Sequence, residues 1–357
     1  MLTPNVNLSN KTILVTGAAG FIGAKVMSAL AMRGDDVVGI DNINDYYDVR
    51  LKYGRLVECG FPQPADGYAF GDCQSSSVWP GCRFVRMDIC DKPSVDELFA
   101  SEHFDAVVNL AAQVGVRYSV ENPYAYVQSN VLGFLNILEA CRHNSVSHLV
   151  FASSSSVYGL NSQVPYSEDD KVDTPVSLYA ATKKADELMA HSYAKLYGIP
   201  VTGLRFFTVY GPWSRPDMAP MLFANAMTEG KPIKIFNEGD LIRDFTYIDD
   251  IVAGTIHALD RPSVADECAN RVPYRIFNIG CSQPVKLMDF ISELERALGK
   301  EAEKLYLPMQ QGDVYQTNAD TSKLEKLIGY KPQVSLHEGV AEFVKWYLSD
   351  KNPLRKA

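Results

Sequence analysis

Tyr179 and Lys183, two side chains that could move a proton, lie four residues apart. On a helix this spacing brings the phenol and the ammonium to one face, one turn apart. A neighbouring ammonium stabilises a phenolate, so a tyrosine in this setting can act as a base near neutral pH. A serine run at residues 153–156 precedes the pair, and a glycine-rich turn lies near the start of the chain. Together these features indicate hydride chemistry at a sugar or alcohol carbon.

The glycine-rich turn at residues 17–23 follows an apolar segment that predicts a strand and precedes a segment that predicts a helix. In this setting glycines permit a tight turn, a close approach of a pyrophosphate and close packing of the helix. The start of the helix adds amide donors and the positive end of its dipole. The sequence therefore predicts a dinucleotide site.

Asp41 ends the second predicted strand, at the distance from the glycine turn where a carboxylate can hold ribose hydroxyls. Its charge would repel a 2′-phosphate, which favours NAD over NADP. A strand-end turn residue is the weaker alternative for Asp41, given the turn before it. Residues at the ends of the third and fourth predicted strands complete the contacts that we expect with the dinucleotide. Each of them alone could instead serve only to pack the core. The predicted cofactor-binding residues are Gly17, Gly20, Phe21, Ile22, Gly23, Asp41, Asn42, Asp88, Ile89, Leu110, Ala111, Ala112, Tyr179 and Lys183.

The elements that must position these residues alternate between strand and helix. Apolar runs predict strands at residues 11–16, 36–40, 83–89, 106–112, 148–153 and 201–206, and helical spacing predicts helices at 21–33, 94–101, 124–143 and 179–197. This alternation is typical of an α/β fold, a Rossmann-type doubly wound parallel sheet with helices on both faces. After about Gly211, proline and glycine separate shorter elements. We therefore expect an NAD-binding domain at 1–210, and at 211–357 a smaller mixed α/β substrate lobe with segments returning to the first domain.

Composition excludes several other classes of protein. The chain has 357 residues, a net charge of −9 and 22% charged residues, so it carries no basic footprint for nucleic acid or an anionic membrane. It has no long uncharged apolar run, and residues 1–10 are polar without a signal-peptide core, so we expect a cytoplasmic protein.

The seven cysteines are odd in number and form no C-x-x-C pair, which favours reduced structural thiols. Zinc at Cys59, Cys73 and Cys82 is the alternative, but their spacing is irregular and no histidine lies nearby, so we predict no metal site. The loop between Cys59 and Cys82 is either functional or mobile, and we assign it no role.

Six motifs carry a resemblance that covers nearly the whole chain. The sequence resembles the extended short-chain dehydrogenase/reductase family and, within it, the UDP-glucuronate 4-epimerases. A tyrosine and a lysine four apart are common on helices, but the order of the motifs argues against chance. The motifs are GAAGFIG at 17–23, DNINDYY at 41–47, SSSSVYG at 153–159, YAATK at 179–183, RFFTVYGP at 205–212 and RDFTYIDD at 243–250.

The resemblance implies a catalytic set of Ser154, Tyr179 and Lys183. Tyr179 would take the proton of the sugar 4-hydroxyl while a hydride passes from C4 to the nicotinamide. Lys183 would place its positive charge beside the tyrosine and would also hold the nicotinamide ribose. Ser154 would hydrogen-bond the reacting oxygen. The 4-keto sugar would then turn about its pyrophosphate, and the hydride would return to the opposite face. Because the cycle is redox-neutral, the NAD should stay bound between turnovers.

The residues around this set favour epimerisation of a uronate. Related enzymes that eliminate or decarboxylate carry an acid in the serine run, whereas residues 154–157 contain no carboxylate. Many relatives that use neutral sugars carry Asn at the position of Thr208, whose hydroxyl could bind a carboxylate at C5. We therefore expect Ser155, Ser156, Thr208 and Arg215 to hold the uronate and so suppress loss of carbon dioxide from the 4-keto acid.

Two further residues complete the predicted substrate site. Arg243 lies in one of the motifs, and a guanidinium can bind a pyrophosphate bidentately. Asp313 could contact the uridine ribose. Arg215 and Arg243 could instead be surface salt-bridge partners, an alternative that is stronger for Arg215.

Other functions remain open from the sequence. The nearest is 4-epimerisation of UDP-glucose or UDP-N-acetylglucosamine, and from another class comes a catalytically silent NAD-binding scaffold. The resemblance also implies a homodimer through the helices at 124–143 and 179–197. Their apolar faces could instead simply cover the sheet.

Overall fold

A mostly parallel sheet of eight strands forms the centre of the protein. The computed structural model describes residues 10–310 and 314–355. The strand order is β12-β7-β6-β5-β1-β2-β4-β3, and only the edge strand β3 runs antiparallel to its neighbour. These strands are β1 (Thr12–Thr16), β2 (Asp36–Asp41), β3 (Cys73–Ser75), β4 (Cys82–Arg86), β5 (Ala106–Asn109), β6 (His148–Ser154), β7 (Val201–Phe206) and β12 (Tyr274–Ile279).

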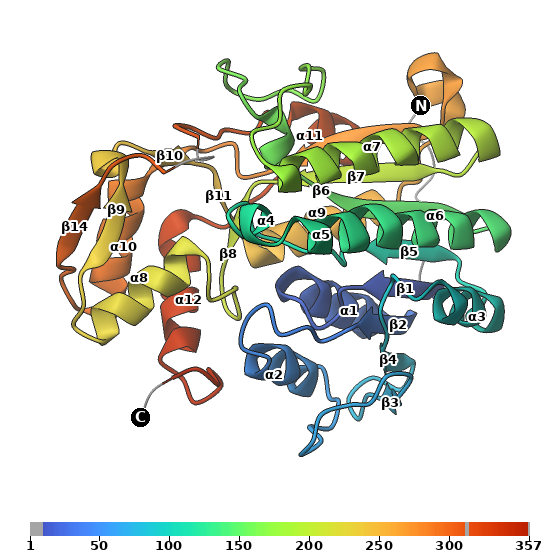
Figure 1. Cartoon of the computed structure of the whole chain (residues 1–357), viewed down its shortest axis with the longest axis horizontal. Coiled ribbons are helices and arrows are strands. Elements are labelled where there is room, and N and C mark those ends of the chain that lie inside the picture. The colour runs from blue at the N-terminus through green and yellow to red at the C-terminus, as the bar shows by residue number, and fades with distance from the viewer. Residues whose placement is uncertain (1–9, 311–313, 356–357) are drawn as a thin grey trace.

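Helices cover both faces of this sheet (Figure 1). Ile13 and Val15 of β1 pack into the core beneath α1 and α9, whereas Leu14 packs into the opposite core beneath α3, α6 and α7. Because successive side chains of a strand point to opposite faces, an apolar run of this kind needs a helix layer on each side. The helices are α1 (Phe21–Arg33), α3 (Lys92–Glu102), α6 (Phe134–His143), α7 (Leu178–Tyr197) and α9 (Ile248–Leu259). The predicted fold class is confirmed.

A smaller lobe lies beside the carboxyl ends of the strands and contains short two-stranded pairs (Figure 1). Not all of the chain after residue 210 belongs to it, because β12 extends the main sheet and α11 (Ser322–Ile328) packs on β12. The elements of the lobe are α8 (Ala219–Thr228), β9 (Ile233–Phe236), β10 (Ile242–Arg243), β13 (Val285–Lys286), α10 (Leu287–Leu298), β14 (Lys304–Leu307) and α12 (Leu336–Tyr347). β8 (Thr208–Tyr210) pairs with β11 (Phe245–Tyr247) between the two parts.

The helix expected at residues 124–143 differs from the prediction at its centre. It is helical throughout, but η1 (Val127–Gly133) is π-helical and lies between α5 (Pro123–Tyr126) and α6. Within this wider turn, the Asn130 side chain donates to the Gln113 carbonyl at 3.1 Å and to Thr182 Oγ1 at 3.0 Å. A π-turn interrupts the regular hydrogen-bond pattern of an α-helix, and such turns are common near functional sites. Here it ties the end of β5 to α7.

The segment at residues 59–82 also differs from a plain loop, because β3 within it pairs with β4 and adds the antiparallel edge. All seven cysteines are free thiols. None of the helices in the described part of the chain has both the length and the apolar composition that crossing a membrane requires.

Candidate active site

A cavity of about 1120 Å³ lies at the carboxyl ends of the parallel strands and extends to residues of the smaller lobe. The strand order reverses between β1 and β5, and in doubly wound sheets such a switch point forms the ligand crevice. Every site residue predicted from the sequence lines this cavity except Asp313, which lies outside the described residues. The fold therefore brings together residues that the sequence spreads from Gly17 to Arg243.

The glycine turn is shaped for the close approach of a ligand. Gly17 has φ of +69°, and a Cβ added there would lie 2.8 Å from the Ala111 nitrogen. A Cβ on Gly23 would lie 2.0 Å from the Gly17 oxygen, so only glycine allows α1 to start this close to the turn. Within the described residues, no side chain caps α1 and its first turn carries no acid. Its amide groups are therefore available to an anionic group.

Asp41 ends β2 and lines the cavity. Its Oδ1 accepts from the Ile43 amide at 2.7 Å, and its Oδ2 accepts from the Ala19 amide at 3.2 Å. Lys52 Nζ lies 3.5 Å from Oδ1. Two carboxylate oxygens have about four acceptor sites, so these contacts leave capacity for hydroxyl donors such as those of a ribose.

The crevice beside the glycine turn is fixed by hydrogen bonds between neighbouring strands. Thr16 Oγ1 donates to Asn109 Oδ1 at 2.7 Å and accepts from the Leu110 and Ala111 amides at 3.1 and 3.0 Å. Further along the edge, Asn42 Nδ2 donates to Asp88 Oδ2 at 3.0 Å. We call this side of the cavity the glycine-turn wall, which comprises residues 17, 20–23, 41–42, 88–89 and 110–112.

The first two turns of α7 carry Tyr179 and Lys183. The helix begins at Leu178, where the Ser177 hydroxyl caps it by accepting from the Ala180 amide at 3.1 Å. Lys183 is 3% exposed, and its Nζ donates to the Ala152 carbonyl at 2.9 Å and to Asp186 Oδ2 at 3.2 Å. Burial raises the pKa of Asp186 to about 7, although the Lys183 charge opposes this shift. Among the described residues, the Tyr179 hydroxyl has no hydrogen-bond partner, which leaves it free for a substrate.

The serines of the run at 153–156 divide into two groups. The Ser153 hydroxyl donates to the buried Glu187 at 2.7 Å, so it joins the core network of Glu187 and Arg205. Ser154 Oγ instead accepts from both the amide and the hydroxyl of Ser156, at 3.1 and 2.9 Å. Since Ser154 accepts twice, its own proton remains available for an oxygen in the cavity.

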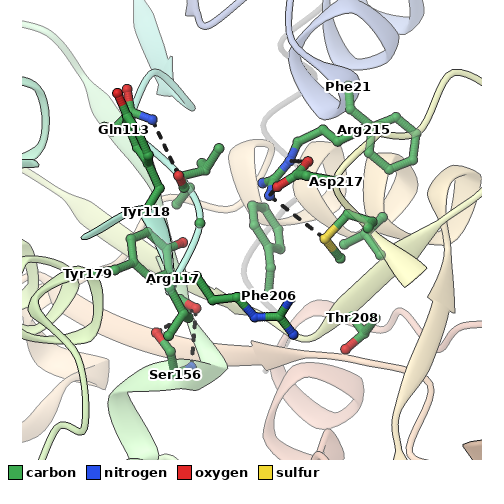
Figure 2. Close-up of a pocket in the computed structure, with 18 of the residues that line it drawn as sticks. Phe21, Gln113, Arg117, Tyr118, Ser156, Tyr179, Phe206, Thr208, Arg215 and Asp217 are labelled. Carbon is green, nitrogen blue, oxygen red and sulfur yellow. Dashed lines mark hydrogen bonds and ion pairs between the residues drawn. The ribbon is translucent and has the colours of Figure 1, made fainter. Parts of the chain in front are cut away.

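A second wall of the cavity lies opposite the start of α7, the helix that carries Tyr179 and Lys183. Figure 2 shows Arg215, Asp217 and Thr208 on one side and Tyr179 and Ser156 on the other. We call the residues Thr208, Arg215, Asp217 and Arg243 the arginine wall.

The two arginines of this wall have different partners. Arg215 forms two hydrogen bonds to Asp217, at 3.0 and 2.7 Å. Burial alone would lower the pKa of Arg215, but the Asp217 hydrogen bond and charge raise it above its ordinary value. Arg243 Nη1 donates to the carbonyls of Ile242 and Tyr315, at 2.9 and 3.0 Å. The ion pair considered from the sequence for Arg215 is therefore present, and it lies in the cavity rather than on a remote surface.

Several lining residues were missed by the sequence reasoning. Arg117 lies with its guanidinium 5.5 Å from the Phe236 ring centroid of the smaller lobe, and Tyr118 and Tyr46 line the same region. Tyr46 belongs to the motif at 41–47, and Asp217 follows Arg215 by two residues, so proximity to predicted residues was a usable signal for both. Arg117 lies in a loop and gave no such signal.

The fold and the site together define a class, the dinucleotide-binding α/β enzymes: a glycine turn at the switch point of a doubly wound sheet, with a tyrosine and a lysine one turn apart beside it. The chain belongs to the NAD dependent epimerase/dehydratase family, whose family model matches residues 13–280. The predicted resemblance is confirmed at this level.

Individual relatives match nearly the full length of this chain. UDP-glucuronate 4-epimerase 4 of Arabidopsis thaliana is 48% identical over 97% of this chain and 77% of its own length. A probable UDP-glucuronate 4-epimerase of Rhizobium meliloti is 44% identical over 94% of this chain and 96% of its own length. Among solved structures, the UDP-glucuronic acid 4-epimerase of Bacillus cereus, in complex with UDP-glucuronic acid and NAD, is 37% identical. It has a TM-score of 0.82 and covers 94% of this chain and 98% of its own.

Proposed function

We propose that this protein is an isomerase that converts UDP-glucuronate to UDP-galacturonate through a transient 4-keto sugar, with tightly bound NAD. One observation carries the proposal. A single cavity contains a dinucleotide-type glycine turn, a serine–tyrosine–lysine set and an arginine–threonine wall suited to a carboxylate. The relatives named UDP-glucuronate 4-epimerases, which match along nearly the whole chain, support the same substrate.

The glycine-turn wall fits NAD, because its glycines admit no side chain where the pyrophosphate would approach and Asp41 has spare acceptor capacity. NAD, when bound, supplies a hydride acceptor for sugar C4 and a donor for the return. We propose that residues 1–210 serve mainly NAD and residues 211–357 mainly the nucleotide sugar. In this proposal Arg243 binds the pyrophosphate, and Asp313, which lies outside the described residues, binds the uridine ribose.

The catalytic residues of this chain handle the proton and the charge. Tyr179 removes the proton of the 4-hydroxyl and later returns it. Lys183, fixed by Ala152 and Asp186, places its ammonium on the same face of α7 as the tyrosine. Ser154 uses its remaining proton to hydrogen-bond the 4-oxygen.

The serines and the arginine wall favour a uronate over a neutral sugar. Ser155, Ser156, Thr208 and Arg215 all line the cavity and can hold a carboxylate at C5. A 4-keto uronate is a β-keto acid that readily loses carbon dioxide. A fixed carboxylate, with its bond to C5 held out of line with the ketone, suppresses this loss.

A product assay without added NAD tests the proposal. The purified protein is incubated separately with UDP-glucuronate, UDP-glucose and UDP-N-acetylglucosamine, and the products are resolved by chromatography and NMR. We expect UDP-galacturonate from the first substrate only, with NAD released when the protein is denatured. Conversion of a neutral sugar alone would reassign the substrate, and no conversion of any sugar would favour the silent scaffold.

We further propose a cytoplasmic homodimer that supplies galacturonate units for polysaccharide synthesis. Seven free thiols, among them the exposed Cys73, suit a reducing compartment. Apolar side chains are exposed along the η1 and α7 helices, which pack beside each other and could pair with a second copy. They are Val127, Leu132, Leu188, Leu196 and Tyr197. Light scattering should give twice the chain mass, and a Leu188→Glu, Leu196→Glu double variant should give the monomer.

A further inference from the structure

Three chain segments far apart in sequence meet around Arg215. Tyr46 comes from the loop after β2, Gly115 from the loop after β5, and Arg215 and Asp217 from the segment after β8. We propose that Asp217 and Tyr46 are positioning residues that fix the Arg215 guanidinium for a substrate carboxylate, and that they thereby set the preference for a uronate over a neutral sugar. This inference rests on the proposed function.

Asp217 occupies one edge of the Arg215 guanidinium and leaves another edge available. Arg215 Nε donates to Asp217 Oδ1 at 3.0 Å, and Nη2 donates to Oδ2 at 2.7 Å. Nη2 also donates a weak hydrogen bond to Met218 Sδ at 3.7 Å, and among the described residues Nη1 has no hydrogen-bond partner. A guanidinium has five N–H donors in a planar fork. A second carboxylate can therefore bind the edge formed by Nη1 and Nη2 bidentately while Asp217 keeps the first, and it would replace the weak thioether contact of Nη2.

Tyr46 holds Asp217 in turn. Its hydroxyl donates to Asp217 Oδ2 at 3.1 Å, the same oxygen that accepts from Arg215 Nη2. Burial and the Asp217 charge raise the pKa of Tyr46 to about 12, so the phenol remains a donor at any working pH. Burial alone would raise the pKa of Asp217, but the hydrogen bonds from Arg215 and Tyr46 lower it. The acid is therefore ionised and accepts three charge-assisted hydrogen bonds, two from Arg215 and one from Tyr46.

Packing fixes the phenol where it can reach this acid. The Tyr46 ring lies 4.9 Å from the Tyr118 ring centroid. Gly115 has φ of +100°, and a Cβ added there would lie 2.4 Å from the Tyr46 hydroxyl. Only glycine at this position leaves room for the hydroxyl.

Holding the Arg215 side chain in place before the substrate binds should strengthen the binding of a substrate carboxylate. A free arginine side chain loses much of its rotamer freedom on binding, and a preorganised one has already lost it. A looser arrangement would weaken binding of a carboxylate and leave a neutral sugar, which has no partner for Nη1, unaffected. The alternative, in which Asp217 competes with the uronate for Arg215, predicts the opposite sign: removing the acid would tighten uronate binding.

The experiment compares Tyr46→Phe and Asp217→Asn with the wild-type holoenzyme. We measure kcat and KM for UDP-glucuronate, the dissociation constant of UDP-glucose, the release of UDP-4-keto-pentose and the content of bound NAD. Tyr330→Phe is the matched control, because it removes a tyrosine–aspartate hydrogen bond of 2.8 Å, to Asp250, outside the cavity.

We expect KM for UDP-glucuronate to rise about tenfold in both variants, with a smaller change in kcat. The release of the decarboxylated product should increase, while UDP-glucose affinity, NAD content and the Tyr330→Phe enzyme should stay near wild type. Tyr46→Phe removes a single hydroxyl, so it tests the inference even if Asp217→Asn does not fold.

Four results would overturn the inference: an unchanged KM, a lower KM, equal losses for both sugars, or loss of NAD from Tyr46→Phe. If the wild-type protein converts UDP-glucuronate and the variants match it, only the positioning role fails. If the wild-type protein does not convert UDP-glucuronate, the proposed function fails as well.

Discussion

The two walls of the cavity are built by different means. On the glycine-turn wall, polar groups are satisfied by backbone amides and by neighbouring strands, as in the contacts of Asp41 with Ala19 and Ile43. On the arginine wall, side chains are held by other side chains, and a residue from a distant part of the chain takes part, since Tyr46 donates to Asp217. The first wall is rigid because the sheet holds it. The second depends on a few side-chain bonds, each of which a single substitution can remove.

We infer from this difference that the glycine-turn wall serves cofactor binding and that the arginine wall serves the choice of substrate. A common cofactor needs a fixed shape, which a sheet edge and a glycine turn provide. Discrimination among sugars needs a few adjustable polar groups, which side chains on shorter elements provide. Substitutions on the two walls should therefore affect different observables.

The largest expected effect is at Tyr179, which lies on α7 opposite the arginine wall. Tyr179→Phe removes the hydroxyl that we propose exchanges a proton with the substrate, so kcat should fall by about a thousandfold or more. The protein should still contain NAD and keep its thermal transition. Both are measured beside an epimerisation assay, with Tyr197→Phe at the other end of α7 as the control. Activity within tenfold of wild type would contradict the assigned role.

A change in the glycine-turn wall should abolish cofactor retention. Gly17→Ala combines a positive φ with a Cβ placed 2.8 Å from the Ala111 nitrogen. We expect NAD content to fall at least about tenfold, with activity partly restored by added NAD. Gly34→Ala is the matched control, since Gly34 also has a positive φ of +97° but open space around it. If both variants keep their NAD, the close approach is not needed.

A change in the arginine wall should leave NAD in place and affect the sugar. Thr208→Ala removes a hydroxyl that we expect to bind the uronate, so KM for UDP-glucuronate should rise about fivefold to tenfold. More UDP-4-keto-pentose should be released. Thr208→Ser keeps the hydroxyl and should restore both values. An alanine enzyme with wild-type affinity and no extra by-product would remove Thr208 from the site.

The smallest expected effect lies outside both walls, at His148. This side chain is buried between the Leu259 carbonyl and the Thr202 hydroxyl, at 2.9 and 3.0 Å. Burial lowers its pKa from 6.5 to about 3. Below pH 6.5 the unfolded chain binds a proton that the folded chain does not bind until pH nears 3, so the free energy of unfolding falls as pH falls through this window.

Urea unfolding at pH 7, 6 and 5 measures the effect of His148. In the wild-type protein, His148 should lower the free energy of unfolding by up to about 1.4 kcal/mol for each pH unit below pH 6.5. The His148→Gln protein should not show this part of the decrease. His143→Gln, at an exposed position, should behave as wild type. Equal pH slopes for wild type and His148→Gln would show that this histidine is not buried in its neutral form.

Much of the glycine-turn wall, and of the helix α7 that carries Tyr179 and Lys183, could be predicted from the sequence. The positions of Gly17, Asp41 and Tyr179 follow from short patterns, because a glycine turn, a strand end and a helix face are each set by residues close together in the chain. The prediction was incomplete where packing overrides local preference. The π-turn at η1 is one case, since the contacts of Asn130 with Gln113 and Thr182 accompany the wider turn.

The sequence alone determined which reactive groups this protein carries: a glycine-rich turn, an acid at a strand end, and a tyrosine and a lysine one helical turn apart. Only the tertiary structure decided which partners hold the arginines. Arg215 meets Asp217 two residues away, but Tyr46 reaches that acid from 171 positions earlier in the chain. Local conformational rules act over a few residues, whereas contacts between distant segments exist only after the sheet and the smaller lobe have packed together.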